Sequence, residues 1–293
     1  LFQMHLAVGG AGAQGEDGMI FNSGSPELSL FFINMLKYIA DSLRNFWVPR
    51  SLMYNQKEVD MRKESEIRSE IVEVLRCMWD RGHSNTTGVS ISERTDGERI
   101  IVDQSGTGFR RCKITEDDLL VINSEGDLLE DAPNGSHRRA PANVIIHTEY
   151  YKANPLARAC VHCHAPYTQV FSCEKRDIPP YTLQSIIMGV IPCIVTDDGE
   201  FKEEFRRKNV SLSVPSGLHN RPDVFYVMRE VARSVVSVLG PRNEEMKTHG
   251  LAVTHYQHGI FVFGRSLGEA FDNLERAESN ARAILLSSAL RGF

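Results

Sequence analysis

The stretch from residue 159 to residue 166 limits most strongly what this chain can fold into. It reads Ala-Cys-Val-His-Cys-His-Ala-Pro, so an apolar run leads into two histidines that are separated by one residue. Residues two apart in a strand point to the same side of the sheet, which would place both imidazoles on one face. The pattern therefore predicts a buried strand over residues 159–163 that ends in two metal ligands, His162 and His164.

A third imidazole for the same site is available at His258, which precedes Gly259 far downstream. Three histidines that leave a coordination position open are typical of catalytic metal sites. The spacing alone leaves two other interpretations open. The histidines also fit core residues whose nitrogens bond within the protein, and Cys160 and Cys163 fit half of a zinc ribbon, although the chain has no second Cys-x-x-Cys.

Composition excludes several classes of protein. The chain has 293 residues, 42% hydrophobic and 24% charged, which is enough for a large core. A net charge of -5 with only short basic clusters argues against a nucleic-acid partner. No apolar run approaches the roughly 20 residues that span a bilayer, and six cysteines are too few for a disulfide scaffold. We therefore expect a cytoplasmic protein without a signal peptide or membrane contact, whose partner is a small molecule.

The remaining pattern predicts two regions. Residues 1–60 are expected to form a partly mobile N-terminal extension with one amphipathic helix over residues 26–45. Residues 61–293 are expected to form the second region. Apolar spacing there predicts helices at 65–82, 142–153, 181–188, 222–238 and 267–290, and strands at 88–93, 99–103, 118–123, 159–163, 192–196, 209–214 and in a pair within 250–263. Because strands and helices interleave without a strict repeat, we expect an α/β fold, a single α/β/α domain with a central mixed sheet covered by helices.

Several separated motifs resemble those of the class II aldolase/adducin family. These are a helix that bears His147 and tyrosines, a turn with Pro155, the strand that ends in the histidine pair, and the His258-Gly259 strand before a long helix. Segments 88–92 and 103–108 resemble the two upstream loops of the family. The resemblance covers roughly residues 65 to 290, and the motifs occur in the family's order.

The resemblance implies that His162, His164 and His258 bind one divalent metal ion, Zn, Mn or Fe. It implies a lyase that cleaves a carbon-carbon bond, by aldol cleavage or decarboxylation, through a metal-stabilised enolate. It also implies a homotetramer with sites at the subunit interfaces. Two alternatives stay open: a non-heme iron oxygenase that oxidatively decarboxylates an aryl keto-acid, as in one branch of the family, and an adducin-like module without catalysis.

The sequence departs from the family pattern at the position of the acid-base residue, which falls on Asn143. An amide cannot transfer a proton, so we expect Asn143 to face the pocket without acting as the base. Pro141 and Ala142 replace the serines that hold a substrate phosphate, and Ser105 with Gly106 remains as the main phosphate-loop candidate. These departures predict a non-phosphorylated hydroxy- or keto-carbonyl substrate.

Another group would then have to move protons. Asp177 is the nearest acid downstream of the histidine pair, and Glu149 follows His147 by two residues. Tyr167 offers a phenol close to the histidines and is expected to contact the substrate. We expect Asp177 to transfer the proton, with Glu149 as the second candidate for this catalytic role.

Overall fold

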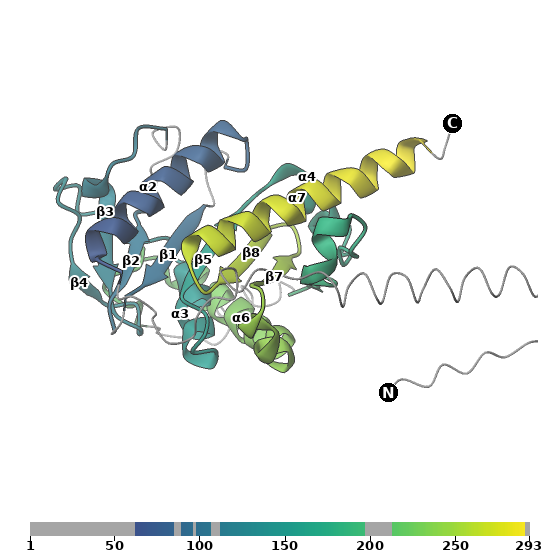
Figure 1. Ribbon diagram of the computed structural model, residues 1–293. Coiled ribbons are helices and arrows are strands. Elements are labelled where there is room, and N and C mark those ends of the chain that lie inside the picture. The colour runs from purple at the N-terminus through teal and green to yellow at the C-terminus, as the bar shows by residue number, and fades with distance from the viewer. Residues whose placement is uncertain (1–61, 85–88, 96–97, 107–111, 197–212, 291–293) are drawn as a thin grey trace, which may run out of the picture. The chain divides into compact units, whose positions relative to one another are not determined.

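The computed structural model of the protein describes residues 62–84, 89–95, 98–106, 112–196 and 213–290 (Figure 1). The predicted N-terminal extension, with its helix at 26–45, lies outside these ranges, as does most of the strand predicted at 209–214. Residues 213 and 214, which are described, are not in a strand.

The centre of the fold is one eight-stranded sheet in the order β4-β3-β2-β1-β5-β8-β7-β6. Neighbouring strands run antiparallel except β6 and β7, which are parallel, so the sheet is mixed, as predicted. The strands are β1 (Ser90–Arg94), β2 (Ile100–Asp103), β3 (Leu119–Ile122), β4 (Leu128–Glu130), β5 (Ala159–Cys163), β6 (Cys193–Ile194), β7 (Leu251–His255) and β8 (Gly259–Gly264).

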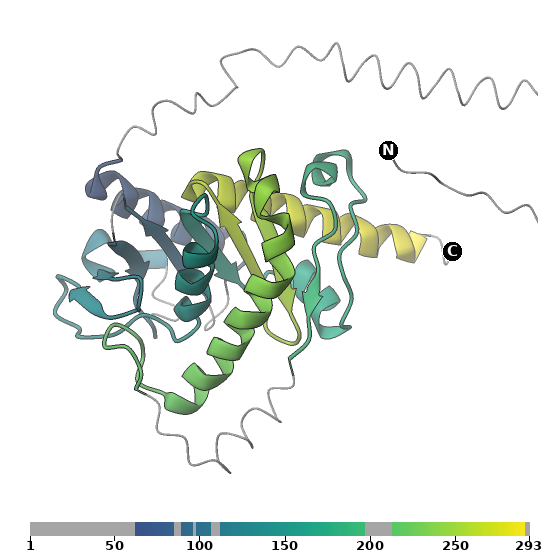
Figure 2. The ribbon, with the colours of Figure 1, turned by 90° about the horizontal axis from the view of Figure 1, so that it is seen from below.

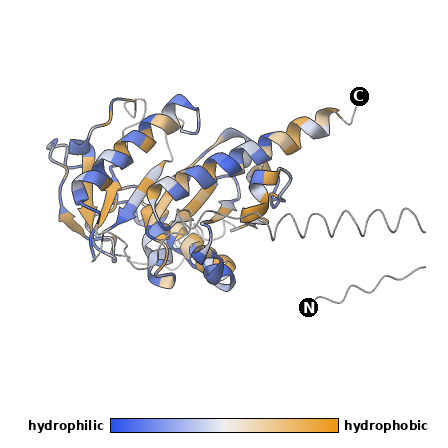
Figure 3. Ribbon diagram, viewed as in Figure 1, coloured by the Kyte–Doolittle hydropathy of each residue, from blue (hydrophilic) through white to orange (hydrophobic). Residues whose placement is uncertain are grey.

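Helices cover both faces of this sheet, which confirms the predicted α/β/α architecture (Figure 1 and Figure 2). The helices are α2 (Glu64–Asp80), α3 (Val144–Ala153), α4 (Pro166–Cys173), α6 (Pro222–Leu239) and α7 (Leu267–Leu290), with the 3-10 segments η3 (Glu116–Asp118), η4 (Leu183–Met188) and η5 (Gly240–Lys247). Residues of α2, α4 and α7 form one apolar core with the sheet, and residues of α3 and α6 form another. Figure 3 shows most of the strands as hydrophobic, while hydrophobic and hydrophilic residues alternate along the covering helices.

The predicted periodicity explains the helices. In α2 the stripe of Ile67, Ile71, Leu75 and Met78 is buried, because these residues recur at the spacing of one helical face. The helix ends before Gly82, whose φ of 74° suits the left-handed turn that glycine adopts most readily. Helices α6 and α7 also follow the predicted ranges closely.

Several elements differ from the prediction. The segment predicted as a helix at 181–188 is the 3-10 segment η4, and the strand predicted at 192–196 is only the two-residue β6. Helix α4, strand β4 and the 3-10 segment η5 were not predicted. Proline at its first position allows α4 to begin directly after the histidine pair. None of the helices in the described ranges is both long and apolar enough to cross a membrane.

Candidate metal centre

The pairing of β5 with β8 brings the predicted ligands together. His162 lies opposite Phe261 and Cys163 lies opposite Ile260, so the residues just beyond this end of the two strands become neighbours. His164 follows the last residue of β5, and His258 precedes the first residue of β8. Histidines 94 or more residues apart in the sequence therefore meet at one end of the central strands.

One ring nitrogen from each of His162, His164 and His258 lies within 4.8 Å of the others. The ring centroids are 5.4 Å apart for His162 and His164, 4.8 Å for His162 and His258, and 5.4 Å for His164 and His258. Nitrogen ligands from three histidines fit a divalent cation such as zinc and leave a fourth position for another molecule. In the described part of the chain, no carboxylate or thiol joins this group.

The surroundings of His162 leave one nitrogen available as a ligand. Its Nδ1 donates to the carbonyl of Ile260 at 2.9 Å, which directs the lone pair to Nε2. Nε2 is buried and has no hydrogen-bond partner among the described residues. Phe261 stacks on the ring with centroids 4.0 Å apart, which holds its plane. Burial, then the neighbouring His258 and His164, depress the pKa of His162 well below its usual range, so the imidazole stays neutral.

His258 is held by a tight turn between β7 and β8. The amide of His258 donates to the carbonyl of His255 at 3.0 Å, and Gln257 adopts a φ of 54°. Gly259 follows with a φ of 149°, and a Cβ there would lie 2.3 Å from the carbonyl oxygen of Cys163. Burial, followed by His255 and His164, lowers the pKa of His258 to about 3. Glycine is thus needed for the close approach that sets His258 beside β5.

A second buried histidine, His147, lies behind the centre. Its Nε2 is 3.1 Å from the hydroxyl of Ser90, its Nδ1 is 2.8 Å from the hydroxyl of Ser92, and Tyr151 contacts Ser92 at 2.8 Å. Burial lowers the pKa of His147 to about 3. The ring of Phe261 packs edge-to-face with the ring of His147, with centroids 6.3 Å apart. His147 is therefore a neutral core residue with both ring nitrogens bonded, and it holds α3 against β1.

Asn143 lies at the N-cap position of α3, one helical turn before His147. Two residues of α3 on the same side of the helix contact β1: Tyr151 contacts Ser92, and His147, one turn nearer the start of the helix, contacts Ser90. Ser90 is paired with His162 on β5. The next position on this side of the helix, Asn143, is thus directed toward the end of the sheet that carries the three ligands. Its Oδ1 is buried without a hydrogen-bond partner among the described residues.

The two predicted acids lie elsewhere. Asp177 is exposed, and its carboxylate accepts the amide of Cys193 on β6 at 2.7 Å. Glu149 pairs with Lys152 at 3.1 Å on α3, and it is two residues from the buried His147, on the outward side of the helix. The structure does not bring either carboxylate into the histidine cluster.

The predicted substrate-contact residues are divided between two places. The amide of Ser105 donates to the carbonyl of Arg139 at 2.8 Å, and the carbonyl of Gly106 accepts Arg138 at 2.6 Å. This loop therefore lies against the segment that leads into Asn143. Tyr167 is the second residue of α4, and its ring packs on the core beside α7 with the Arg282 guanidinium 5.6 Å away.

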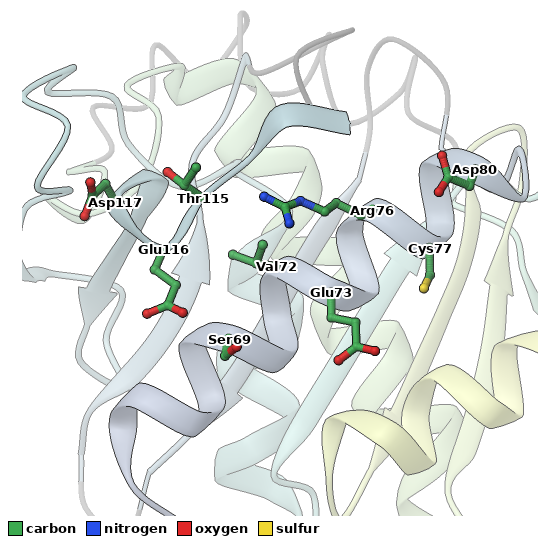
Figure 4. Close-up of a pocket in the computed structure, with 9 residues that line it drawn as sticks. All are labelled: Ser69, Val72, Glu73, Arg76, Cys77, Asp80, Thr115, Glu116 and Asp117. Carbon is green, nitrogen blue, oxygen red and sulfur yellow. The ribbon is translucent and has the colours of Figure 1, made fainter.

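A groove of about 510 Å³ lies between α2 and η3 (Figure 4). It contains none of the predicted site residues, and its guanidinium group, from Arg76, donates to the carbonyl of Ile114 at 2.6 Å. Its lining consists of Ser69, Val72, Glu73, Arg76, Cys77, Asp80, Thr115, Glu116 and Asp117. Most of these side chains are exposed and, among the described residues, they form no metal-binding group, so we place the candidate site at the histidines.

One histidine beside the candidate ligands, His255, was not predicted from the sequence. Its Nδ1 is 3.2 Å from Nδ1 of His258, and its Nε2 contacts the hydroxyl of Thr196. The spacing of three residues between His255 and His258 was a usable signal, because a tight turn between two strands brings such residues together. The contribution of Thr196 depends on the pairing of β6 with β7 and had no local signal.

Comparison with known proteins agrees with this geometry. The family model described as "Class II Aldolase and Adducin N-terminal domain" matches residues 69–285. The chain belongs to this family. The predicted resemblance is therefore confirmed over most of the chain.

Two relatives illustrate the range of the class II aldolase family. A 3-oxo-tetronate 4-phosphate decarboxylase from Haemophilus influenzae is 25% identical over 222 residues, which cover 72% of this chain and 83% of the relative. A methylthioribulose-1-phosphate dehydratase from Gluconobacter oxydans is 24% identical over 211 residues, which cover 71% of this chain and 86% of the relative.

A solved class II aldolase structure shares the fold. The L-fuculose-1-phosphate aldolase from Thermus thermophilus superposes with a TM-score of 0.57 at 21% sequence identity, covering 78% of this chain and 97% of that one. At this identity the similarity establishes the fold and leaves the reaction to be argued from the site.

Proposed function

We propose that this class II aldolase family member is a divalent-metal-dependent lyase that cleaves a carbon-carbon bond of a non-phosphorylated hydroxy- or keto-carbonyl substrate. The observation that carries the proposal is the cluster of His162, His164 and His258, in which Nε2 of His162 is buried and has no partner among the described residues. A buried nitrogen of this kind is costly unless another group binds it.

The three histidines would hold the ion, Zn, Mn or Fe, and leave positions for the substrate oxygen atoms. A bound divalent cation supplies a Lewis acid that draws electrons from a substrate carbonyl and so favours cleavage of the adjacent bond. The protein's own part is to keep His162 and His258 neutral by burial, which lowers the pKa of each, and to fix the ring of His162 through Ile260 and Phe261.

The surroundings of the Ser105 loop support a substrate without a phosphate group. The amide of Ser105 already donates to Arg139, so it is not available to an anion. Pro141 and Ala142 provide no hydroxyl before Asn143, and proline also lacks an amide hydrogen. Each lost hydrogen bond to a charged group costs roughly 1.5–3 kcal/mol, which would remove most of the affinity for phosphate. The relatives named above, by contrast, carry phosphate in their substrate names.

We propose that Asn143 binds the substrate through hydrogen bonds and does not transfer protons. The support is its buried Oδ1 at the end of α3 that faces the ligands. Proton transfer by Asp177, or by Glu149, stays a prediction. Asp177 is the better placed of the two, because it is bonded to β6, whose neighbour β7 ends at the turn that carries His258.

We also propose that the protein is a homo-oligomer, with a tetramer as the expected form. The supporting surface is the apolar patch, which we define as Leu183, Ile186 and Ile187 of η4 with Leu286 and Leu290 of α7; all five are exposed. Segments 181–190 and 283–290 contain no charged residue, and η4 contacts α7. Exposed apolar patches of this kind mark protein interfaces, and an uncharged one fits a second copy of itself.

The test begins with protein purified without chelator, whose metal content is measured. Cleavage is then followed with non-phosphorylated hydroxy-carbonyls and keto-acids, with matched sugar phosphates as competitors, in the presence and absence of oxygen. We expect metal-dependent cleavage of a non-phosphorylated compound without oxygen uptake. Oxygen consumption that matches decarboxylation would instead establish the iron oxygenase, and cleavage of the phosphorylated compounds alone would contradict the substrate class.

A further inference from the structure

A fourth histidine lies directly behind the proposed metal ligands. His255 is the last residue of β7 and is 1% exposed. Its Nδ1 is 3.2 Å from Nδ1 of His258, while its Nε2 contacts the hydroxyl of Thr196, two residues beyond β6. Both ring nitrogens of His255 are therefore engaged with protein groups, so it is not placed to be a metal ligand itself.

This chain of contacts constrains the proton positions on His258. A neutral imidazole carries one proton, and the nitrogen that binds a metal must be the unprotonated one. Because Nδ1 of His258 faces His255, the metal-binding nitrogen of His258 is Nε2, and the proton must be on Nδ1. That proton can be donated only if Nδ1 of His255 is unprotonated, which places the proton of His255 on Nε2, where it is donated to Thr196.

The other tautomer of His255 would prevent His258 from binding the metal. If His255 carried its proton on Nδ1, it would donate to His258, and the proton of His258 would move to Nε2, the nitrogen needed for the metal. A hydroxyl accepts as well as donates hydrogen bonds, so the hydroxyl oxygen of Thr196 can accept the hydrogen bond from Nε2–H of His255. The position of Thr196 is fixed by the parallel pairing of Ile194 with His255.

We propose that His255, together with Thr196, is a positioning residue of the metal centre that selects the metal-binding tautomer of His258 and fixes the orientation of its ring. The inference rests on the proposed function, because it assumes that His258 is a ligand. It adds two residues that are not ligands: His255 ends β7, the strand next to β8, and Thr196 follows the edge strand β6.

The test measures metal affinity in the absence of substrate. Zn²⁺ binding to the apo protein is followed by competition with a chromogenic chelator for the wild type and for His255→Leu, His255→Gln and His255→Asn. Asparagine places Oδ1 where histidine has Nδ1 and so keeps an acceptor for His258, whereas glutamine and leucine do not. We expect His255→Leu and His255→Gln to weaken zinc binding about 10- to 100-fold, and His255→Asn to retain most of the wild-type affinity. His249→Leu is the matched control, since His249 is also largely buried but lies at the opposite end of β7, where it bonds Gly250.

A second readout reports the tautomer itself. Long-range ¹H–¹⁵N spectra of the apo protein should show His258 protonated on Nδ1 in the wild type and in His255→Asn, and shifted toward Nε2 in His255→Leu. Thr196→Val should produce a smaller shift in the same direction, while Thr196→Ser should not. If His255→Leu does not fold, the zinc affinities of His255→Asn and His255→Gln are compared instead, and a clearly higher affinity for His255→Asn supports the inference.

Wild-type zinc affinity and an unchanged His258 tautomer in His255→Gln and His255→Leu would overturn the inference while leaving the three-histidine site intact. Failure of the wild-type protein to bind zinc, or undiminished binding by His162→Ala, would instead contradict the proposed function. The two failures are therefore distinguishable.

Discussion

Individual residues at the end of β5 decide whether the centre can form. The histidine pair could be predicted from sequence because strand geometry is local, and a short apolar run at the start of residues 159–163 leads directly into it. The position of Glu149 could not be predicted, because it depends on which side of α3 faces the sheet. In the structure His147 takes the inward side, and Glu149 pairs with Lys152 on the outward side.

Replacing His162 with alanine should abolish metal binding and leave the fold in place. The side chain is central to the cluster, but its partners in the sheet, Phe261 and the buried Ser90, are held by their own strands, so the core persists with a cavity. Elemental analysis should fall from about one metal ion per chain to nearly none, with an unchanged far-ultraviolet circular dichroism spectrum. Unchanged metal stoichiometry would refute the site, and His249→Ala serves as the control.

Replacing Gly259 with alanine should damage the centre without removing a ligand. The new Cβ would meet the carbonyl oxygen of Cys163 at 2.3 Å and the ring of His164 at 2.8 Å, and φ is 149°. We expect the free energy of unfolding to fall by about 1–3 kcal/mol, as for other overpacked sites, and zinc affinity to fall as His164 moves. Gly240→Ala is the control, since no atom lies within 4 Å of its added Cβ. Full zinc affinity in Gly259→Ala would contradict the close approach.

The buried His147 should make the metal-free protein sensitive to acid. Its pKa is about 3 in the folded state, against about 6.5 in the unfolded chain. The unfolded state therefore binds more protons between pH 6.5 and 3, and the free energy of unfolding decreases as the pH falls through this window. One such group contributes a loss of about 2 kcal/mol between pH 6.5 and 5. In urea titrations at the two pH values, His147→Gln should lose less stability than the wild type by about this amount, and equal losses would contradict the assignment.

At the scale of elements, long periodic segments were predictable and short ones were not. Helices α2, α6 and α7 each bury one stripe over 17 or more residues, so their apolar spacing was informative. Helix α4 has eight residues and β4 has three mostly exposed residues, which is too short for a pattern to emerge. The stability of such short elements comes from contacts with distant residues.

Helix α4 illustrates this dependence in its first turn. The carboxylate of Glu278 on α7 accepts the amides of Tyr167 and Thr168, each at 2.8 Å. These amides have no partner within the helix, and a carboxylate also complements the positive end of the helix dipole. Glu278→Ala should therefore lower the free energy of unfolding by about 1.5–3 kcal/mol in urea titrations.

The matched comparison for Glu278 is Glu275→Ala on the same helix, whose side chain is 33% exposed and pairs with Arg81 and His83. We expect a loss below about 1 kcal/mol there, because exposed ion pairs contribute little. Equal losses for the two variants would show that Glu278 does not stabilise α4.

At the scale of the whole molecule, the fold class and the family could be predicted because several local motifs occurred in a fixed order. The resemblance also implied a homotetramer, but the surface proposed for its interface could not be predicted, because it depends on which apolar residues remain exposed after folding. The exposed leucines at the end of α7 were indistinguishable in sequence from the buried ones that precede them on the same helix.

The proposed oligomer should dissociate when charge enters the apolar patch. Leu183 is 86% exposed and Ile186 is 61% exposed, so lysine at both positions should leave the folded subunit intact. Sedimentation velocity should show a shift from oligomer to monomer for the double variant Leu183→Lys, Ile186→Lys. Leu129→Lys, at a 46% exposed position on β4, is the control and should not change the mass. An oligomer that survives the double substitution would assign its interface to another surface.

The place of β5 between β1 and β8 also determines when the centre can be assembled during synthesis. β1 precedes β5 in the chain, but β8 and His258 leave the ribosome more than 90 residues after His162 and His164. The nascent chain thus presents two ligands long before the third, and the turn that carries His258 is positioned only when β8 has paired with β5. In the proposed site the three ligands are together only after β8 has paired with β5, so the ion would be inserted after this part of the sheet has formed, and its supply would set the fraction of chains that carry it.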